Sequence, residues 1–376
     1  MTGRPLRIGV DASGWKTGRG IARYLDGLFT SLLSLGEPLE FTFFCPRGIA
    51  VPLRQGLWRR VEVARALVPR SYTDGLLPRA VATESLDLMH FPANTFWGKP
   101  HVPTVVTIHD LALLEFPDRF FRTRWAAAKY RARFTRLGGI ASRVIAVSGH
   151  TAGKIVARNP HPCEMTTVHN GIDDRFRDAS NVRAPVDGRV LYAGALDFRK
   201  NLTRLLEAFD IVRRTRPRSH LVLAGRRGTD RRVYPLIEIE ARRLALGPSV
   251  EIVANPDDAR LVELYRSASA FVFPSLYEGF GLPVLEAMAA GCPVACSRAA
   301  SLPEVTGDAA LLFDAEDPEG MAEAIGSLLD DGKLAASLSE AGRERAEGFT
   351  WERCARATLG VYRAVLGNRF PTLPRK

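Results

Sequence analysis

Short apolar runs alternate with longer amphipathic segments along the 376 residues of the chain. Apolar runs of four to eight residues, bounded by glycine, proline or polar residues, are typical of buried parallel strands. Longer segments with apolar residues at helical spacing are typical of helices that cover a sheet. The alternation predicts an α/β layer structure. The predicted strands are residues 6–10, 39–45, 86–91, 104–109, 142–147, 189–192, 221–225, 250–253 and 270–273.

One stretch of the second half predicts a strand, a loop and a helix in direct succession. The apolar run Ala270 to Phe273 indicates a buried strand, and Pro283 opens an alanine-rich helix that Gly291 and Pro293 end. A turn of this kind at the carboxyl end of a parallel sheet presents backbone N–H groups and the positive end of a helix dipole. The pattern therefore predicts a phosphate-binding site.

Two glutamates flank this predicted phosphate-binding site. Glu278 lies in the loop before the helix, and Glu286 lies about one turn inside it. Ionised carboxylates only accept hydrogen bonds, which suits the hydroxyls of a sugar or a ribose. The residues alone leave an alternative open, in which Glu286 complements the helix dipole and Glu278 is a solvated loop charge.

A basic pair, Arg199 and Lys200, stands directly before a predicted helix that carries Leu205 and Phe209 on its apolar face. Cations are unfavourable at a helix N-terminus unless an anion joins them. The placement predicts a phosphate beside the pair, and a solvated basic pair is the alternative.

The chain opens with a strand, a glycine-containing loop and a helix, as dinucleotide-binding proteins do. The segment Gly18-Arg-Gly20-Ile-Ala-Arg23 has arginine where the third glycine of the dinucleotide fingerprint belongs, which disfavours a nicotinamide enzyme. Gly18 and Gly20 would let a ligand approach the backbone closely, and a simple tight turn is the alternative.

Composition and length indicate a globular protein of two domains, since 46% of the residues are hydrophobic and 25% are charged. The chain has no run of eighteen apolar residues, and its first residues lack the apolar segment of a signal peptide, so we expect a cytoplasmic location. The five cysteines form no Cys-x-x-Cys pair and indicate neither a disulfide framework nor a zinc site.

The net charge of +11 is concentrated in the first half of the chain. Residues 1–180 carry 25 Lys and Arg against 15 Asp and Glu, whereas residues 181–376 carry 27 against 26. The stretch Arg119–Arg136 has seven basic residues, no acidic ones and several aromatic ones, and predicts a basic amphipathic helix. Such a helix could contact an anionic membrane or an acidic acceptor, or be a solvated face. No recognisable nucleic-acid-binding module accompanies the charge, so we expect no nucleic-acid partner.

The segment from Glu278 to Gly291, Glu-Gly-Phe-Gly-Leu-Pro-Val-Leu-Glu-Ala-Met-Ala-Ala-Gly, resembles the donor-site signature of the family 4 retaining glycosyltransferases. Arg199-Lys-Asn-Leu, Val105-Val-Thr-Ile-His-Asp-Leu and His169-Asn-Gly-Ile-Asp resemble further motifs of that family. The resemblance implies a GT-B fold, with two Rossmann-like domains facing a cleft. Residues 1–175 would bind the acceptor and residues 186–350 the nucleotide-sugar, and a C-terminal helix, about 351–370, would return to the first domain.

The resemblance also implies roles for individual residues. Glu286 would hold the ribose diol, Glu278 a hydroxyl of the donor sugar, and Arg199 and Lys200 the diphosphate, while His109 would reach the sugar at the reacting centre. The further donor-binding residues would be Gly279, Phe280, Gly281, Leu282 and Pro283, and the acceptor-binding residues would be Gly18 and Gly20.

The activity implied by the resemblance is retaining, metal-independent transfer of a sugar from a nucleotide-sugar substrate, without a cofactor. No Asp-x-Asp metal signature occurs near the predicted site, in agreement with this expectation. GDP-mannose is the expected donor, and a hydroxyl of a surface glycan or lipid-linked sugar is the expected acceptor, met at the inner face of the membrane. The alternatives are a UDP-sugar donor, a sugar-nucleotide epimerase of the same fold, and a non-catalytic module that binds anions or membranes.

Overall fold

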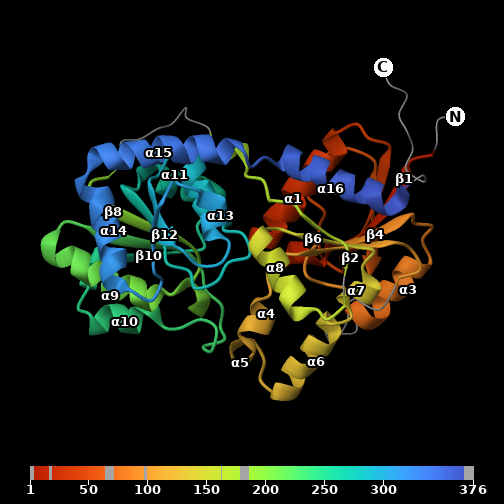
Figure 1. Ribbon diagram of the computed structural model, residues 1–376, viewed down its shortest axis with the longest axis horizontal. Coiled ribbons are helices and arrows are strands. Elements are labelled where there is room, and N and C mark those ends of the chain that lie inside the picture. The colour runs from red at the N-terminus through yellow and green to blue at the C-terminus, as the bar shows by residue number, and fades with distance from the viewer. Residues whose placement is uncertain are drawn as a thin grey trace. The chain divides into compact units, whose positions relative to one another are not determined.

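The computed structural model (Figure 1) describes residues 4–16, 19–63, 72–96, 100–161, 163–177 and 186–367. The chain divides into two compact units, each built from separate segments. Unit 1 comprises Met1–Leu114, Trp125–Gly171 and Thr350–Lys376. Unit 2 comprises Glu115–Arg124 and Ile172–Phe349.

Within the described residues, unit 1 contains a seven-stranded parallel sheet in the order β3-β2-β1-β4-β5-β6-β7. The strand order reverses beside β1, where β2 lies on one side and β4 on the other. The strands are β1 (Leu6–Asp11), β2 (Leu39–Pro46), β3 (Trp58–Val63), β4 (Leu88–Phe91), β5 (Thr104–Ile108), β6 (Arg143–Ala146) and β7 (Met165–Thr167).

Helices cover both faces of this sheet (Figure 1). One core cluster lies under α1 and α16, and a second lies under α3, α7 and α8. The helices of unit 1 are α1 (Arg19–Ser34), α3 (Leu77–Ala82), α4 (Ala112–Glu115), α6 (Arg124–Phe134), α7 (Leu137–Ile140), α8 (Gly149–Arg158) and α16 (Trp351–Leu366), with α4 and α6 each crossing the unit boundary by one residue. The helix α16, near the end of the chain, thus packs beside the first helix, α1.

Unit 2 contains a six-stranded parallel sheet in the order β10-β9-β8-β11-β12-β13 among its described residues. Its order reverses beside β8, as it does beside β1 in unit 1. The strands are β8 (Arg189–Ala195), β9 (His220–Arg226), β10 (Val250–Ala254), β11 (Ala270–Phe273), β12 (Val294–Ser297) and β13 (Leu311–Phe313). In α/β sheets of this kind, ligands bind at the carboxyl ends of strands near the reversal.

The helices of unit 2 lie on both faces of its sheet, with α9, α10 and α14 on one and α11, α12 and α15 on the other (Figure 1). They are α5 (Pro117–Phe120), α9 (Leu202–Thr215), α10 (Ile237–Arg243), α11 (Asp258–Ser267), α12 (Leu282–Ala289), α13 (Leu302–Thr306), α14 (Pro318–Asp330) and α15 (Gly332–Glu347). A 3₁₀ turn, η5 (Phe198–Lys200), precedes α9. The predicted α/β class with two Rossmann-like sheets is therefore confirmed.

The predicted single helix over Arg119–Arg136 is wrong. The helix α5 ends at Phe120, Phe121 is extended with φ −107° and ψ 139°, and α6 begins only at Arg124. Pro117 starts the first piece and the extended Phe121 ends it, so the basic stretch is divided between the two units. In the part of the chain that the structure describes, no helix combines the length and the apolar character that crossing a membrane requires.

Candidate functional site

The connection between β11 and α12 has the geometry that the sequence predicts. All four residues of β11 are buried, and α12 begins at Leu282 with Pro283 in its first turn. Gly281 caps the helix with a φ of 106°, a conformation that residues with a Cβ rarely adopt. Gly291 follows the helix with a φ of 75°. Glycine thus occupies the two positions with positive φ at the ends of α12, and proline occupies its first turn.

Lys200 and Glu278 meet in an ion pair in this part of unit 2. The Lys200 ammonium donates to Oε1 of Glu278, and the two side chains are 8% and 12% exposed. The hydroxyl of Ser275 donates to the same oxygen at 2.6 Å. Lys200 Nζ also lies 5.1 Å from the ring centroid of Phe273. A charged pair so nearly removed from water needs these additional contacts to offset its desolvation.

Arg199 turns away from this pair onto Asp197. The Asp197 carboxylate caps η5 by accepting from the Arg199 N–H at 3.0 Å, and it also accepts from the Arg199 guanidinium, at 3.1 and 2.9 Å. The carbonyl of Arg199 in turn accepts from the Leu276 N–H at 2.7 Å and lies 3.1 Å from the Ser275 hydroxyl oxygen. The anions beside the basic pair are therefore two carboxylates, and the loop before α9 is tied directly to the loop after β11.

Glu286 is buried inside α12, with only 4% of its surface exposed. The hydroxyl of Tyr265, from α11, donates to its Oε2 at 2.9 Å. Nearby, the buried hydroxyl of Ser301 lies 2.9 Å from the Phe280 carbonyl and 3.1 Å from the Glu278 carbonyl. These contacts hold one carboxylate in a fixed orientation and the loop before α12 in a fixed conformation.

His109 follows β5 in unit 1, and the chain around it fixes its ring. Its backbone N–H donates to Asn94 Oδ1 at 2.6 Å. Nε2 lies 2.7 Å from the Pro92 carbonyl, which can only accept, so Nε2 carries a proton and donates it. The Tyr24 ring stands edge-on to the imidazole with 4.6 Å between centroids. Burial lowers the pKa of His109 below 6.5, and a neutral ring then has Nδ1 as its acceptor.

A series of hydrogen-bonded, buried polar side chains begins at Tyr24, which contacts the His109 ring. The hydroxyls of Tyr24 and Thr107 are 3.1 Å apart, and Thr107 Oγ1 is 2.9 Å from Nε2 of His90. Nδ1 of His90 is 2.7 Å from the hydroxyl of Tyr362, in α16. Burial and the nearby His109 lower the pKa of His90 to about 3. The C-terminal helix is thus connected to the face that carries His109 through four buried side chains.

The structure brings Arg199, Lys200, Glu278 and Glu286 into the same unit, around the β11–α12 connection, and places His109 in the other unit. Gly20 is exposed in α1, and a Cβ added there would meet nothing within 4 Å. Gly18 lies outside the described residues.

The hydroxyls that orient the two glutamates are not predicted from the sequence. The only indication of Ser275 in the sequence is its place just after a buried strand. Tyr265 lies 21 residues before Glu286, and no local sequence pattern indicates that the two side chains meet. Across the described segments, no group of three or more His, Cys, Asp or Glu side chains is placed to hold a metal ion.

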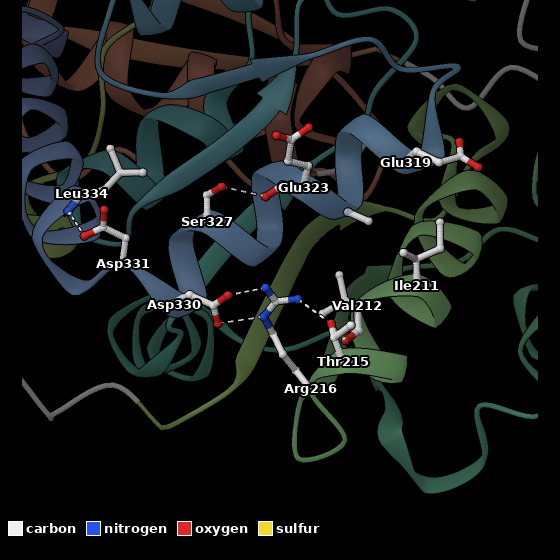
Figure 2. Close-up of a pocket in the computed structure, with 11 residues that line it drawn as sticks. Ile211, Val212, Thr215, Arg216, Glu319, Glu323, Ser327, Asp330, Asp331 and Leu334 are labelled. Carbon is white, nitrogen blue, oxygen red and sulfur yellow. Dashed lines mark hydrogen bonds and ion pairs between the residues drawn. The ribbon is translucent and has the colours of Figure 1, made fainter.

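A pocket of about 540 Å³ lies between α9 and α14, away from these residues (Figure 2). Arg216, directly after α9, donates to Asp330 at the end of α14 and to the hydroxyl of Thr215 at 2.8 Å. None of the predicted site residues lines this pocket. It is a surface feature of unit 2 that is separate from the candidate site.

Two family models match consecutive parts of the chain. The model described as Glycosyltransferase Family 4 matches residues 18–176, and the model described as Glycosyl transferases group 1 matches residues 174–345. O-antigen chain mannosyltransferase B of Escherichia coli is 32% identical to this chain over 318 residues, which are 81% of this chain and 80% of that protein. Glycogen synthase of Mycobacterium tuberculosis is 28% identical over 94% of this chain and 93% of its own length.

Solved structures share the fold over nearly the whole chain. Sucrose-phosphate synthase from Thermosynechococcus elongatus superposes with a TM-score of 0.76 at 22% identity, over 96% of this chain and 99% of that one. HepE from Anabaena, in complex with UDP and glucose, superposes with a TM-score of 0.74 at 16% identity, over 96% and 100% of the two chains. The extent of the match to the Escherichia coli relative, together with the two family models, shows that this chain belongs to family 4 of the glycosyltransferases.

Proposed function

We propose that the protein transfers a sugar, with retention of its anomeric configuration, from a nucleoside diphosphate sugar to a hydroxyl of a glycan or lipid-linked acceptor. GDP-mannose is the proposed donor. The observation that carries the proposal is the ion pair between Lys200 and Glu278 at the loop that leads into α12, with Glu286 buried in that helix. A cation from the turn before α9 then meets a sugar-binding carboxylate in the loop before α12, and a ribose-binding carboxylate follows inside α12.

The reaction needs positive charge where the leaving diphosphate becomes negative. Lys200 and Arg199 lie on the turn before α9, and the first amides of α12 face the loop that carries Glu278, the partner of Lys200. In the structure, Lys200 is paired with Glu278 and Arg199 with Asp197. We infer that the donor exchanges these partners, with the diphosphate taking Lys200 and a sugar hydroxyl donating to Glu278. The leaving phosphate then takes the acceptor proton as the hydroxyl attacks from the same face.

Glu278 is better placed as a hydrogen-bond acceptor than as a covalent nucleophile in this scheme. After Lys200 has moved to the diphosphate, Oε1 of Glu278 still accepts from the Ser275 hydroxyl, and this bond stabilises the negative charge of the carboxylate and lowers its nucleophilicity. His109 is proposed to accept a hydrogen bond from the donor sugar through Nδ1, since Nε2 is committed to the Pro92 carbonyl. Charge stabilisation in the scheme rests on protein groups alone, without a cofactor.

Mannose is proposed because the Escherichia coli relative is a mannosyltransferase that acts on the O-antigen chain. A UDP-sugar donor is the first alternative, and the structure of HepE from Anabaena in complex with UDP and glucose supports it. A sugar-nucleotide epimerase of the same fold is the second alternative, and it would convert the nucleotide-sugar when no acceptor is present.

An acceptor at the inner face of the membrane is proposed from the basic residues of the first half of the chain. Arg122, Arg124 and Arg131 are exposed, and Trp125 between them is 67% exposed. Basic side chains around an exposed tryptophan suit an anionic membrane surface. Neutralising the three arginines should weaken binding to anionic vesicles, whereas unchanged vesicle binding would remove the membrane from the proposal.

The decisive experiment is thermal unfolding with GDP, UDP or ADP at millimolar concentration, beside the Glu286→Ala variant. A ligand that binds only the folded state raises the unfolding midpoint. We expect GDP to raise the midpoint of the wild type and to lose this effect in Glu286→Ala. Glu319→Ala, a change at an exposed glutamate of α14, is the matched control and should respond like the wild type. No shift with any nucleotide would refute the transferase proposal.

A further inference from the structure

Residues 115–124, the strap, leave unit 1 and join unit 2. They follow Leu114 and precede Trp125, which both belong to unit 1, yet the strap itself clusters with unit 2. It contains the helix α5 and three phenylalanines, Phe116, Phe120 and Phe121. The strap therefore brings aromatic side chains from the first half of the chain to the unit that holds the candidate donor site.

Phe116 of the strap contacts both loops that carry the ion pair. Its ring stands edge-on to Phe198, with centroids 5.3 Å apart, and edge-on to Tyr277, with centroids 5.8 Å apart. Phe198 begins the 3₁₀ turn that ends at Lys200, and Tyr277 directly precedes Glu278. The one ring thus packs against the neighbours of both charged residues.

Further contacts hold the strap on the same two loops. The Phe120 ring lies 5.7 Å from Phe198, and the guanidinium of Arg199 lies over Phe120 at 5.8 Å. Arg119 lies over Phe198 at 5.2 Å. Cation–π contacts and tilted aromatic pairs of this kind are attractive, and together they favour one conformation of the turn that holds the basic residues.

A hydrogen-bonded loop fixes the strap from the other side. Arg232 donates to the carbonyl of Phe121 at 3.3 Å and pairs with Asp230 at 2.6 Å. In the same loop, the carbonyl of Val233 accepts from the N–H of Phe198 at 2.8 Å. The strap and the 3₁₀ turn are therefore anchored to one support.

We propose that Phe116 is a positioning residue for the diphosphate of the donor, an inference that rests on the proposed function. Its ring sets the spacing of the two loops, and so places Lys200 and Glu278 to take the phosphate and the sugar together. The bond from the Leu276 N–H to the Arg199 carbonyl already joins the two loops, and the Phe116 ring adds contacts with both of them. The pair Glu286 and Tyr265 lies in α12 and α11, outside the two loops that carry Phe198 and Tyr277, so we expect recognition of the ribose to be independent of Phe116.

The test compares a nucleoside diphosphate with its monophosphate. Affinities are measured by calorimetric titration of the full chain with the diphosphate that stabilises the wild type, and with the monophosphate of the same base. In Phe116→Ala we expect the diphosphate to bind about tenfold more weakly, the effect of losing two aromatic contacts, and the monophosphate to bind within about twofold of the wild type. Phe116→Tyr, which keeps the ring, should restore diphosphate affinity.

Asp118→Ala is the matched control, because Asp118 is an exposed residue of the same helix, and it should bind both nucleotides like the wild type. Phe116→Leu keeps apolar bulk without a ring and serves where Phe116→Ala does not fold. Unchanged diphosphate affinity in both ring-deleting variants, or equal losses for both nucleotides, would overturn the positioning role alone. A wild type that binds no nucleoside diphosphate would overturn the proposed function and this inference with it.

Discussion

His90 is a buried histidine whose surroundings keep its imidazole ring neutral. It is fully buried in β4, and its two ring nitrogens are bonded to Thr107 and Tyr362. Burial lowers its pKa to about 3, from 6.5 in an exposed histidine. Between these values the unfolded chain binds a proton that the folded chain does not, so the free energy of unfolding falls as the pH falls through this window.

We therefore expect the pH dependence of stability to change in His90→Gln, which can keep both hydrogen bonds without a titrating ring. From pH 7 to pH 5, the wild type should lose about 2 kcal/mol of unfolding free energy through this residue alone, and the variant should not. Denaturant unfolding at both pH values measures the difference. His101→Gln, at an exposed histidine, is the control, and equal losses in the wild type and His90→Gln would contradict the assignment.

The ion pair shows where residue-level prediction from sequence reaches its limit. Lys200 and Glu278 are both predicted as ligand contacts by the motifs around them, and they lie 78 residues apart. That they pair with one another depends on two loops meeting, which no local pattern encodes. Arg199 differs, because its partner Asp197 lies only two residues before it, a local pair that the sequence analysis does not single out.

At the scale of elements, Gly281 controls the start of α12. Its φ is 106°, and a Cβ added there would lie 2.7 Å from the Cδ2 atom of Leu302. We expect Gly281→Ala to lose about 1–3 kcal/mol of unfolding free energy from backbone strain and crowding. Denaturant unfolding gives this loss, and Gly332→Ala, where an added Cβ meets nothing within 4 Å, is the control. A variant as stable as the wild type would show that the helix begins equally well without glycine.

Many elements with a continuous apolar pattern are predicted from the sequence, but the short buried strand β12 is not among the predicted strands. The run that forms β11 and the proline and glycine that bound α12 are clear in the sequence, and the structure confirms them. The edge strand β3 is absent from the predicted strands because most of its residues are polar or only half-buried. The basic stretch 119–136 is predicted as one helix, because no glycine or proline marks the break at Phe121, whose carbonyl accepts a hydrogen bond from the distant Arg232.

At the scale of the molecule, unit 1 joins the two ends of the chain. Trp351, at the start of α16, lies against Gly27 of α1, where a Cβ would come within 2.2 Å of the indole. The glycine therefore permits a contact between helices more than three hundred residues apart in sequence. Unit 2 has its own sheet and its own candidate nucleotide site. We infer that the two units can be stabilised or weakened separately.

Calorimetry of the full chain should therefore show two unfolding transitions with different responses. The nucleotide should raise the transition of unit 2, because only a folded donor site binds it. Trp351→Ala removes a side chain that is 8% exposed, at a cost of about 3–5 kcal/mol, and should lower the transition of unit 1 by about 10 °C. Leu57→Ala, at a side chain that is 61% exposed in unit 1, should move neither. A single transition that responds to both the nucleotide and Trp351→Ala would mean that the units unfold together, and that the donor site depends on the packing of α16.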